Sequence, residues 1–340
     1  MKAITSPIGV AVVGLGVAGI EHARAYRTLP DCELKWLCDL DAEKAAGLAK
    51  ELGAGIGAAT FEKILADPAV EVISIASYDD AHFSQAISSL RAGKHVFVEK
   101  PLCYSLEELK TLKRVWQETG RRHLASNLAV ARASTLYRWL REAIAKGELG
   151  ELYAIDGEYL YGRFSKITEG WRKNVEDYSV MLGGGVHLVD VMLSLARERP
   201  VSVVAAGNRI VTSGTAFRYH DFAAATYTFP SGLIGRICAN FGCVHRHQHI
   251  LRVFGTKGTF LYDDQGARLW TSREDAAAPV MIDRSPARVP KGALIPEFIR
   301  RIREGQASQP DAQREFDLIA VCLAADRAVA SSHPVAIEYL

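Results

Sequence analysis

The chain has 340 residues, of which 49% are hydrophobic and 24% are charged, and its formal net charge is +2. This composition is typical of a globular protein, and the length predicts two domains. A net charge this close to zero argues against a nucleic-acid or acidic-membrane partner, and we find no apolar run of the ~18 residues needed to cross a membrane.

The N-terminal region resembles a secretory signal in one respect, because Lys2 precedes an apolar run over residues 8–20. Three regularly spaced glycines within that run, and the pattern that follows it, instead predict a buried strand and a helix. Six cysteines show neither C-x-x-C pairs nor zinc-site spacing, which predicts a reduced, cytoplasmic setting. They are Cys32, Cys38, Cys103, Cys238, Cys243 and Cys322.

Strand and helix patterns alternate over residues 1–125. Apolar runs predict buried strands at 9–16, 32–39, 70–77, 95–100 and 123–127. Helical patterns lie between them, at 18–28, 41–53, 60–66, 79–93 and 105–120, the last with a capping-box start. This alternation predicts an α/β domain, a Rossmann doubly wound parallel sheet with crossover helices.

The pattern changes after residue 130, and residues 126–340 read as a second domain. A helix at 133–147 is followed by strand-like runs at 151–162, 201–210, 222–243 and 250–264, with a surface loop at 273–293. Helices at 295–305 and 311–331 lead to a final strand, and these last elements can pack back on the first domain. We expect an α+β domain with a large, mostly antiparallel open sheet.

A glycine motif joins the first predicted strand to the first predicted helix. VVGLGVAG supplies G-x-G-x-x-G as Gly14, Gly16 and Gly19. The glycines allow a tight turn, close backbone approach to a pyrophosphate and close packing of helix on strand. Backbone at Val17 and Ala18 begins the helix, whose N-terminus favours phosphate. A glycine turn without a ligand is the alternative.

Asp39 ends the second predicted strand, twenty residues after Gly19. A carboxylate there binds ribose hydroxyls and repels a 2′-phosphate. Leu40 follows, without an adjacent arginine or serine, so NAD is expected rather than NADP.

Two further segments carry chemistry. AGKHVFVEKPL (92–102) ends a strand in Glu99-Lys100-Pro101 at the carboxyl edge of the sheet, where ligands bind in such folds. MLGGGVHLVD (181–190) places His187 after three glycines. With the glycine motif and Asp39, these segments resemble the glucose–fructose oxidoreductase / inositol dehydrogenase / rhizopine-catabolism (Gfo/Idh/MocA) family over essentially the whole chain.

The resemblance implies a nicotinamide cofactor and hydride transfer on a sugar, nucleotide sugar or cyclitol. It implies a homodimer or homotetramer that packs through the large sheet. Lys100 and His187 match the catalytic positions. Cofactor contacts are expected at Glu99, Lys100, Asn127, Trp171 and Arg172, and His82 is expected to be mostly structural. The glycines before His187 are interpreted as a turn that admits backbone close to nicotinamide and substrate.

One position departs from the family. Many members carry an aspartate four residues before the motif histidine, where this chain has Gly183. The residues that could substitute, and that are candidates for substrate contact, are Tyr161, Asp177, Tyr178 and Asp190. The sequence does not choose among them.

Histidine suits the acid/base role and lysine suits stabilisation of the developing alkoxide, although the two roles can be exchanged. The missing aspartate leaves a non-catalytic dinucleotide-binding regulator as an alternative, and an NAD-recycling, glycosidase-like enzyme is another. The segment HRHQH (245–249) places three histidines on one face of an expected strand. We expect that face to line a cleft or a subunit interface rather than to bind metal, so no metal site is predicted.

Overall fold

The computed structural model describes residues 6–57, 60–286 and 289–340. The chain divides into two compact units. The first comprises the described residues up to Ala129, together with Val289–Asp317 and Leu340; the second comprises the described residues of Val130–Arg288 and Leu318–Tyr339. Among the described residues, no helix is long and apolar enough to cross a membrane.

The first unit contains a parallel sheet of six strands in the order β3-β2-β1-β4-β5-β6. The strands are β1 (Ile8–Val13), β2 (Cys32–Cys38), β3 (Ile56–Gly57), β4 (Val72–Ile75), β5 (His95–Val98) and β6 (Leu124–Ser126). Every residue of β1 and β4 is buried, which explains why these runs are continuously apolar rather than alternating.

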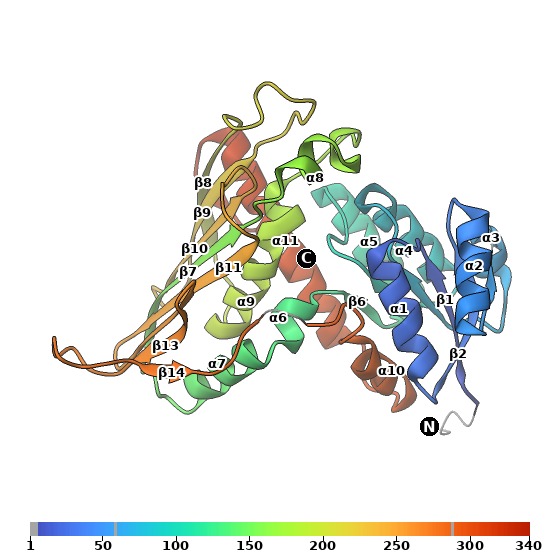
Figure 1. Cartoon of the computed structure of the whole chain (residues 1–340), viewed down its shortest axis with the longest axis horizontal. Coiled ribbons are helices and arrows are strands. Elements are labelled where there is room, and N and C mark those ends of the chain that lie inside the picture. Colours follow the sequence, from blue (N-terminus) through green and yellow to red (C-terminus); the bar gives the residue numbers. More distant parts are fainter. Residues whose placement is uncertain (1–5, 58–59, 287–288) are drawn as a thin grey trace. The chain divides into compact units, whose positions relative to one another are not determined.

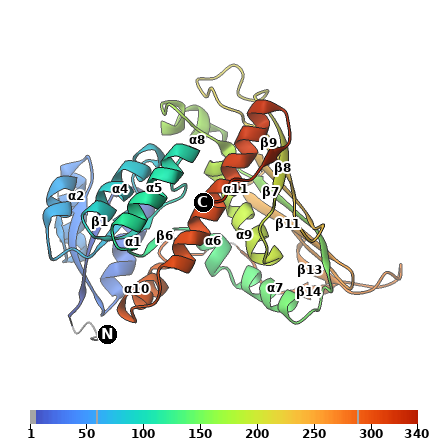
Figure 2. The same cartoon turned by 180° about the vertical axis from the view of Figure 1, so that it is seen from behind.

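Helices cover both faces of this sheet. They are α1 (Val17–Thr28), α2 (Ala42–Leu52), α3 (Phe61–Ala66), the 3₁₀ turn η1 (Asp79–Ala81), α4 (His82–Arg91), α5 (Leu106–Glu118) and α10 (Ile295–Arg303). Within this unit, α1 lies in front of the sheet in Figure 1, and α4 and α5 lie in front of it in the reverse view of Figure 2. Local signals fix the helix ends: Ser105 and Glu108 form the expected capping box, and Asp41 caps α2.

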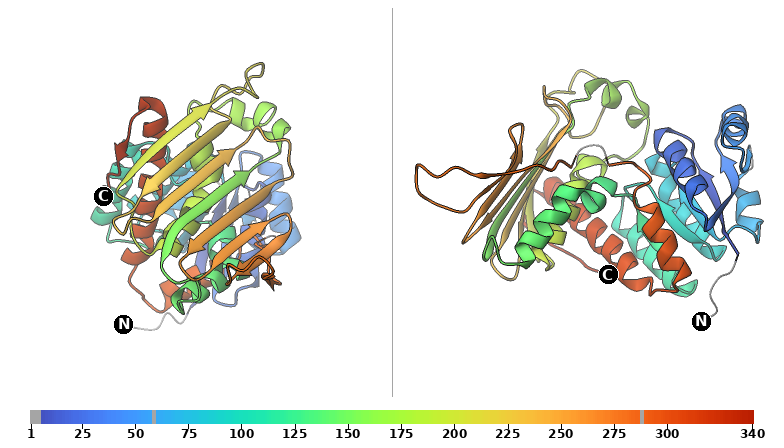
Figure 3. Two further views of the ribbon diagram at one scale, coloured as in Figure 1. Left: turned by 90° about the vertical axis from the view of Figure 1, so that its left-hand side faces the viewer. Right: turned by 60° about the horizontal axis from the view of Figure 1, so that its bottom comes forward.

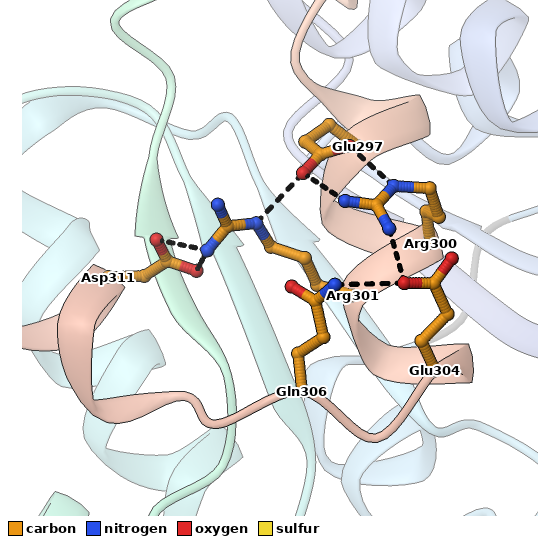
Figure 4. Close-up of polar contacts among 6 residues, drawn as sticks. All are labelled: Glu297, Arg300, Arg301, Glu304, Gln306 and Asp311. Carbon is orange, nitrogen blue, oxygen red and sulfur yellow. Dashed lines mark hydrogen bonds and ion pairs between the residues drawn. The ribbon is translucent and has the colours of Figure 1, made fainter.

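Helix α10 completes the core of the first unit although it lies far along the chain. Ile295, Phe298, Ile299 and Ile302 pack with β1 and α1 in one cluster of buried apolar side chains. Its other face carries ion pairs (Figure 4): Arg300 binds Glu297 and Glu304, and Arg301 binds Glu297 and Asp311, the latter at 2.6 Å. These pairs join α10 to the start of α11 (Gln309–Ser331), which continues into the second unit.

The second unit contains a nine-stranded sheet in the order β14-β13-β12-β11-β7-β10-β9-β8-β15. Its strands are β7 (Leu152–Leu160), β8 (Ser202–Asn208), β9 (Phe222–Thr228), β10 (Ile234–Asn240), β11 (Gln248–Gly255), β12 (Thr259–Asp263), β13 (Gly266–Trp270), β14 (Val280–Ile282) and β15 (Val335–Ala336). All pairings are antiparallel except β10 with β7. The predicted fold class is confirmed, but β14 lies inside the expected loop 273–293.

The helices of this unit gather on one face of the sheet. They are α6 (Ala129–Ala133), α7 (Thr135–Ala145), α8 (Phe164–Thr168), the 3₁₀ turn η2 (Trp171–Lys173), the π-helical turn η3 (Met181–Gly185), α9 (Val186–Ala196) and the second part of α11. Figure 3 (left) shows the other face of the sheet without a covering helix. On β7 that face carries Asp156 and Glu158, which pair with Arg236 and Arg252 at 2.6 and 2.7 Å.

The adjacent pair of His95, the first residue of β5, and His123, directly before β6, makes the free energy of unfolding depend on pH. Nδ1 of His95 accepts a hydrogen bond from the amide of His123 at 2.9 Å, and burial, with the nearby charges of His123 and Arg122, lowers the pKa of His95 to about 3. An unfolded histidine titrates near ~6.5. Between these values the unfolded chain binds the extra proton, so the free energy of unfolding falls as pH decreases below about 6.5.

We expect His95→Asn, which keeps an acceptor near the position of Nδ1, to reduce this acid sensitivity by up to about 1.4 kcal/mol per pH unit. Urea unfolding of both proteins at pH 7 and pH 5 measures the difference. The half-buried His245 is the control of opposite sign, because its hydrogen bonds to the Arg246 backbone and to Asp264 raise its pKa. His245→Asn should therefore increase acid sensitivity slightly. Equal acid sensitivity in wild type and His95→Asn would contradict the assignment.

Candidate functional site

The glycine turn after β1 has three different local constraints. Gly14 has φ +83°, and a Cβ there would lie 2.4 Å from the Ser77 amide nitrogen. A Cβ at Gly19 would lie 1.8 Å from the Gly14 carbonyl oxygen, so glycine is required for α1 to pack on β1. Gly16 has an ordinary φ of −67°, and a Cβ there would meet nothing within 4 Å. Space is therefore open at the start of α1.

Helix α1 has no side-chain cap at Gly16, so no cap occupies its first amides, the groups that favour a phosphate. Val17 at that position is exposed and Ala18 is half-buried. These features fit the phosphate part of a dinucleotide, which would lie against the backbone of Gly16, Val17 and Ala18.

Asp39 follows β2 and is held rigidly beside this turn. Its Oδ2 accepts from the Leu15 amide at 2.7 Å and from Lys44 Nζ at 3.2 Å, and its Oδ1 accepts from the Asp41 amide at 3.0 Å. Burial acts to raise the pKa of Asp39, but these donors outweigh it and lower the pKa below its usual value. Asp39 is therefore a fixed, ionised acceptor.

Glu99 is a buried carboxylate at the carboxyl end of β5. Its Oε1 accepts from Asn127 Nδ2 at 2.7 Å and lies 3.4 Å from Nε2 of His22. Nδ1 of His22, on α1, lies 3.0 Å from Ser74 Oγ on β4. Burial acts to raise the pKa of Glu99, but His22, Lys291 and Asn127 lower it to about 2. The ionised carboxylate at the end of β5 thus contacts α1 through His22 and the residue after β6 through Asn127, and His22 in turn contacts β4.

Lys100 and Pro101 follow Glu99 directly, and the peptide bond between them is cis. His82, at the start of α4, is fully buried and holds the backbone of this turn. Its Nδ1 lies 2.8 Å from the Pro101 carbonyl oxygen, and its Nε2 lies 3.2 Å from that of Ser77. His82 therefore supports the position of Lys100.

In the second unit, His187 lies in the first turn of α9 among aromatic rings. Its ring stacks on Tyr159 and His249, with centroids at 5.9 and 5.5 Å. Tyr161 continues the stack and lies 4.6 Å from Phe241. Burial and the nearby His247 lower the pKa of His249 to about 3, so His249 is neutral beside His187.

The three glycines before His187 lie against side chains of the protein itself. A Cβ at Gly184 would lie 2.4 Å from the Tyr159 ring, and one at Gly185 would lie 2.4 Å from Met181 Sδ. A Cβ at Gly183 would lie 2.2 Å from the Tyr178 hydroxyl oxygen. These glycines therefore make room for the protein's own side chains, and it is those side chains that fill the space beside the turn.

Ser179 caps the first backbone amides of this glycine turn. Ser179 Oγ accepts from the amides of Met181 and Leu182 at 3.0 and 3.1 Å and donates to Asp326 Oδ1 at 2.8 Å. Burial raises the pKa of Asp326 to about 7, partly offset by the Ser179 hydrogen bond. The sequence offers no signal for this contact, because the two residues lie 147 positions apart.

The remaining candidates lie in different surroundings. Asp190 is buried on α9 and binds Arg132 at 3.0 Å, in a pair that sequence reasoning missed. Asp177 is exposed. Arg172 donates from Nε to the Tyr178 hydroxyl oxygen at 2.9 Å, and its guanidinium carbon lies 4.5 Å from the Trp171 ring centroid.

The expected alignment of the HRHQH histidines along a strand is wrong. Strand β11 begins at Gln248, so only His249 of the three lies within it. His245 binds Asp264 at 3.1 Å, and Nδ1 of His247 lies 3.0 Å from the Leu160 carbonyl oxygen. Within the described ranges, no group of three or more histidine, cysteine or acidic side chains is arranged to hold a metal ion.

Comparisons with known proteins identify both units. The profile described as "Oxidoreductase family, NAD-binding Rossmann fold" matches residues 8–127, and the GFO/IDH/MocA C-terminal domain matches residues 137–261. The chain is 26% identical to the 2,7-anhydro-N-acetylneuraminate hydratase of Escherichia coli, over 76% of this chain and 68% of that protein. It is 28% identical to the scyllo-inositol 2-dehydrogenase (NAD(+)) of Bacillus subtilis, over 73% and 72%.

Among solved structures, the scyllo-inositol dehydrogenase of Lactobacillus casei, with bound cofactor NAD(H) and scyllo-inositol, has a TM-score of 0.78. The match covers 98% of this chain and 99% of that one at 19% identity, which is evidence for the fold alone.

The contrast between two glycines of the turn gives a direct test of the phosphate site. Gly16→Ala should leave the melting temperature unchanged, because its Cβ meets no protein atom, yet weaken NAD binding at least about tenfold by blocking close backbone approach. Gly19→Ala, whose Cβ collides with Gly14, should destabilise the first unit by more than about 1 kcal/mol. For both variants, calorimetric titration measures the affinity for NAD and thermal unfolding measures the stability. Normal NAD affinity in Gly16→Ala would contradict the site.

Proposed function

Because the chain belongs to the Gfo/Idh/MocA oxidoreductase family, with an NAD-binding Rossmann fold, we propose that it is a dehydrogenase acting on a secondary alcohol or ketone of a sugar, nucleotide sugar or cyclitol. Relatives named as sugar and inositol dehydrogenases support this substrate class. The observation that carries the proposal is that three features of a dinucleotide site lie at one edge of the first sheet. There the open turn at Gly16, the fixed acceptor Asp39 and the lysine after β5 follow the carboxyl ends of parallel strands.

In this proposal, the backbone of Gly16, Val17 and Ala18, together with Asp39, would hold a nicotinamide cofactor, which would supply the hydride acceptor for oxidation and the hydride donor for reduction. His187 removes the hydroxyl proton of the alcohol, and the neutral ring of His249 stacked on it adds no competing positive charge. Lys100 stabilises the oxygen as it gains negative charge. The two roles can be exchanged, since lysine also acts as a base in buried sites.

We propose NAD rather than NADP as the cofactor. Asp39 is ionised and accepts three hydrogen bonds within the protein. These bonds hold its negatively charged carboxylate at the position where ribose hydroxyls would bind. A 2′-phosphate there would meet a carboxylate, and the next residue, Leu40, is fully exposed and offers no positive charge.

One relative is named as a hydratase, and the addition of water involves no net oxidation or reduction. This favours the alternative of an NAD-recycling, glycosidase-like enzyme. The wild-type protein distinguishes the two. In the dehydrogenase, NADH accumulates in proportion to product when NAD and a polyol are supplied. In the alternative, product forms without net NADH.

The cofactor preference is tested by Asp39→Asn. Loss of the charge should lower the ratio of kcat/KM for NAD over NADP at least about tenfold, or ~1.4 kcal/mol. Asp41→Asn is the matched control, since asparagine caps a helix as well as aspartate and Asp41 caps α2. An unchanged ratio in Asp39→Asn would count against the assignment.

The catalytic assignment is tested by Lys100→Ala. This variant should bind NAD within about threefold of wild type and lose about 10²–10⁴-fold in kcat. Lys63→Ala, on the exposed side of α3, is the control and should remain active. His187→Ala should lose a comparable factor and flatten the pH dependence of kcat/KM. Full activity of Lys100→Ala would refute the role of this lysine.

A further inference from the structure

The carboxyl group of Asp326 has no part in the proposed mechanism, yet it is hydrogen-bonded to the segment that precedes His187. Asp326 lies on the second part of α11 and is half-buried. Burial raises the pKa of its carboxyl group to about 7, against the hydrogen bond from Ser179, which lowers it. An ordinary aspartate titrates near ~3.9. Asp326 therefore changes its charge near neutral pH.

The hydrogen bonds of Ser179 determine how this charge reaches the glycine turn. The Ser179 Oγ accepts from the amides of Met181 and Leu182 at 3.0 and 3.1 Å. A hydroxyl oxygen has two lone pairs and one proton, so the two amides use both lone pairs. The proton of Ser179 then points to Oδ1 of Asp326, which lies 2.8 Å away. The hydroxyl thus links the carboxyl group to two backbone amides at once.

Backbone hydrogen bonds continue this path to His187. The Ser179 carbonyl oxygen accepts from the amide of Gly183 at 2.7 Å, and the Met181 carbonyl oxygen accepts from the amide of Val186. The turn η3 runs without a break into α9, whose second residue is His187. Ser179 therefore holds the start of the helix that carries His187.

Cys322 and Tyr227 also lie near Asp326, and both stay neutral near pH 7. Burial, with the charge of Asp326, raises the pKa of Cys322, one turn earlier on α11, well above its ordinary value. Burial likewise raises the pKa of Tyr227, on β9, well above its ordinary value. Asp190, on α9, also acts on Cys322 and is paired with Arg132 at 3.0 Å. A change of charge here near pH 7 is therefore a change at Asp326.

The charge of Asp326 alters the strength of the cap rather than its geometry. A hydrogen bond to an ionised acceptor is about twice as strong as one to a neutral acceptor. Ionised Asp326 attracts the proton of Ser179 and makes Oγ a better acceptor for the two amides, because linked hydrogen bonds polarise one another. Protonated Asp326 keeps the same contacts but weakens them.

We propose that Asp326 is a positioning residue for His187, which acts through Ser179. In its ionised form Asp326 tightens the turn that begins the helix of His187. In its protonated form the turn is looser, and His187 is held less firmly in the orientation that proton transfer needs. The effect on turnover rests on the proposed dehydrogenase function, whereas the effect on the turn does not.

Hydrogen exchange tests the effect on the turn without any turnover. Mass spectrometry follows the peptide over residues 180–187 at pH 6 and pH 8, with rates corrected for the intrinsic effect of pH. Wild type should show about three- to tenfold higher protection at pH 8. Asp326→Asn keeps the size and an acceptor oxygen but cannot ionise, so it should show the weaker protection at both pH values. Residues 188–196, the rest of α9, are the internal control and should show no change.

The sign of this change separates it from a general loss of stability. Because burial raises the pKa of Asp326, the folded chain binds the extra proton between about 4 and about 7. The contribution of Asp326 to the free energy of unfolding therefore increases as pH falls from 8 to 6. Weaker protection of the turn at pH 6 is thus a local effect of the cap.

The pH dependence of kcat/KM tests the effect on turnover. The probes are scyllo-inositol, myo-inositol and a methyl D-glucoside with NAD, and the best of them is used. The ratio of kcat/KM in wild type to that in Asp326→Asn should be near one at pH 6 and about three to ten at pH 8. The titration of His187 cancels in this ratio, because both proteins contain it.

Two further variants provide controls. Asp221→Asn makes the same change at a fully buried carboxylate whose side-chain partner is Thr212, and its ratio to wild type should not vary between the two pH values. Ser179→Ala removes the link, so the pH dependence of protection should disappear, and adding Asp326→Asn should have little further effect. Ser179→Ala also keeps the test decisive if Asp326→Asn does not fold.

The outcomes are distinct. Equal protection of the turn at pH 6 and pH 8 in wild type would overturn the proposal. A ratio of kcat/KM that is the same at both pH values would also overturn it, because that is the result expected of a purely structural role. A wild-type protein that turns over none of the probes would refute the proposed function, while exchange would still decide whether Asp326 controls the turn.

Discussion

The buried carboxylate of Glu99 is the constraint on which the edge of the first sheet depends. It follows the three buried residues that end β5 and precedes the lysine assigned to chemistry. His22 and Asn127 contact it and stabilise a charge at that depth. Through these partners it fixes the ends of β5 and β6 and the inner face of α1. The backbone that presents Lys100 therefore cannot move independently of the helix that begins at the phosphate turn.

The second unit organises its polar groups by a different principle. There, large aromatic rings pack around the glycine turn, and a few hydrogen bonds orient the polar atoms within that packing. Ser179 caps the turn, Asp326 holds Ser179, and Arg172 holds Tyr178. Small residues at 183–185 are what allow rings to approach the helix backbone so closely. Substitutions at these glycines therefore act through the aromatic side chains beside them.

The parts of the molecule that the sequence predicts well are those determined by near neighbours in the chain. The turn at Gly14–Gly19 and the capping box at Ser105 depend on spacing over a few residues, and the structure confirms them. The contact of Tyr178 with Gly183 spans only five positions, yet no periodicity indicates which way the ring turns. That direction depends on Phe217 and Phe241, which arrive from distant segments of the chain. The alternating pattern of residues 245–249 predicts a strand, but β11 begins only at Gln248, so two of the three histidines lie before it.

The composition of the first core has a consequence for biosynthesis. Its apolar cluster takes four side chains from α10, and the last of them is Ile302. A ribosome that has finished residue 129 has therefore made all six strands of the parallel sheet but not the helix that seals one of its faces. At ~5–20 residues per second, about 10–35 s pass before that helix is synthesised. During that interval the apolar side chains that α10 covers in the folded protein lack that cover.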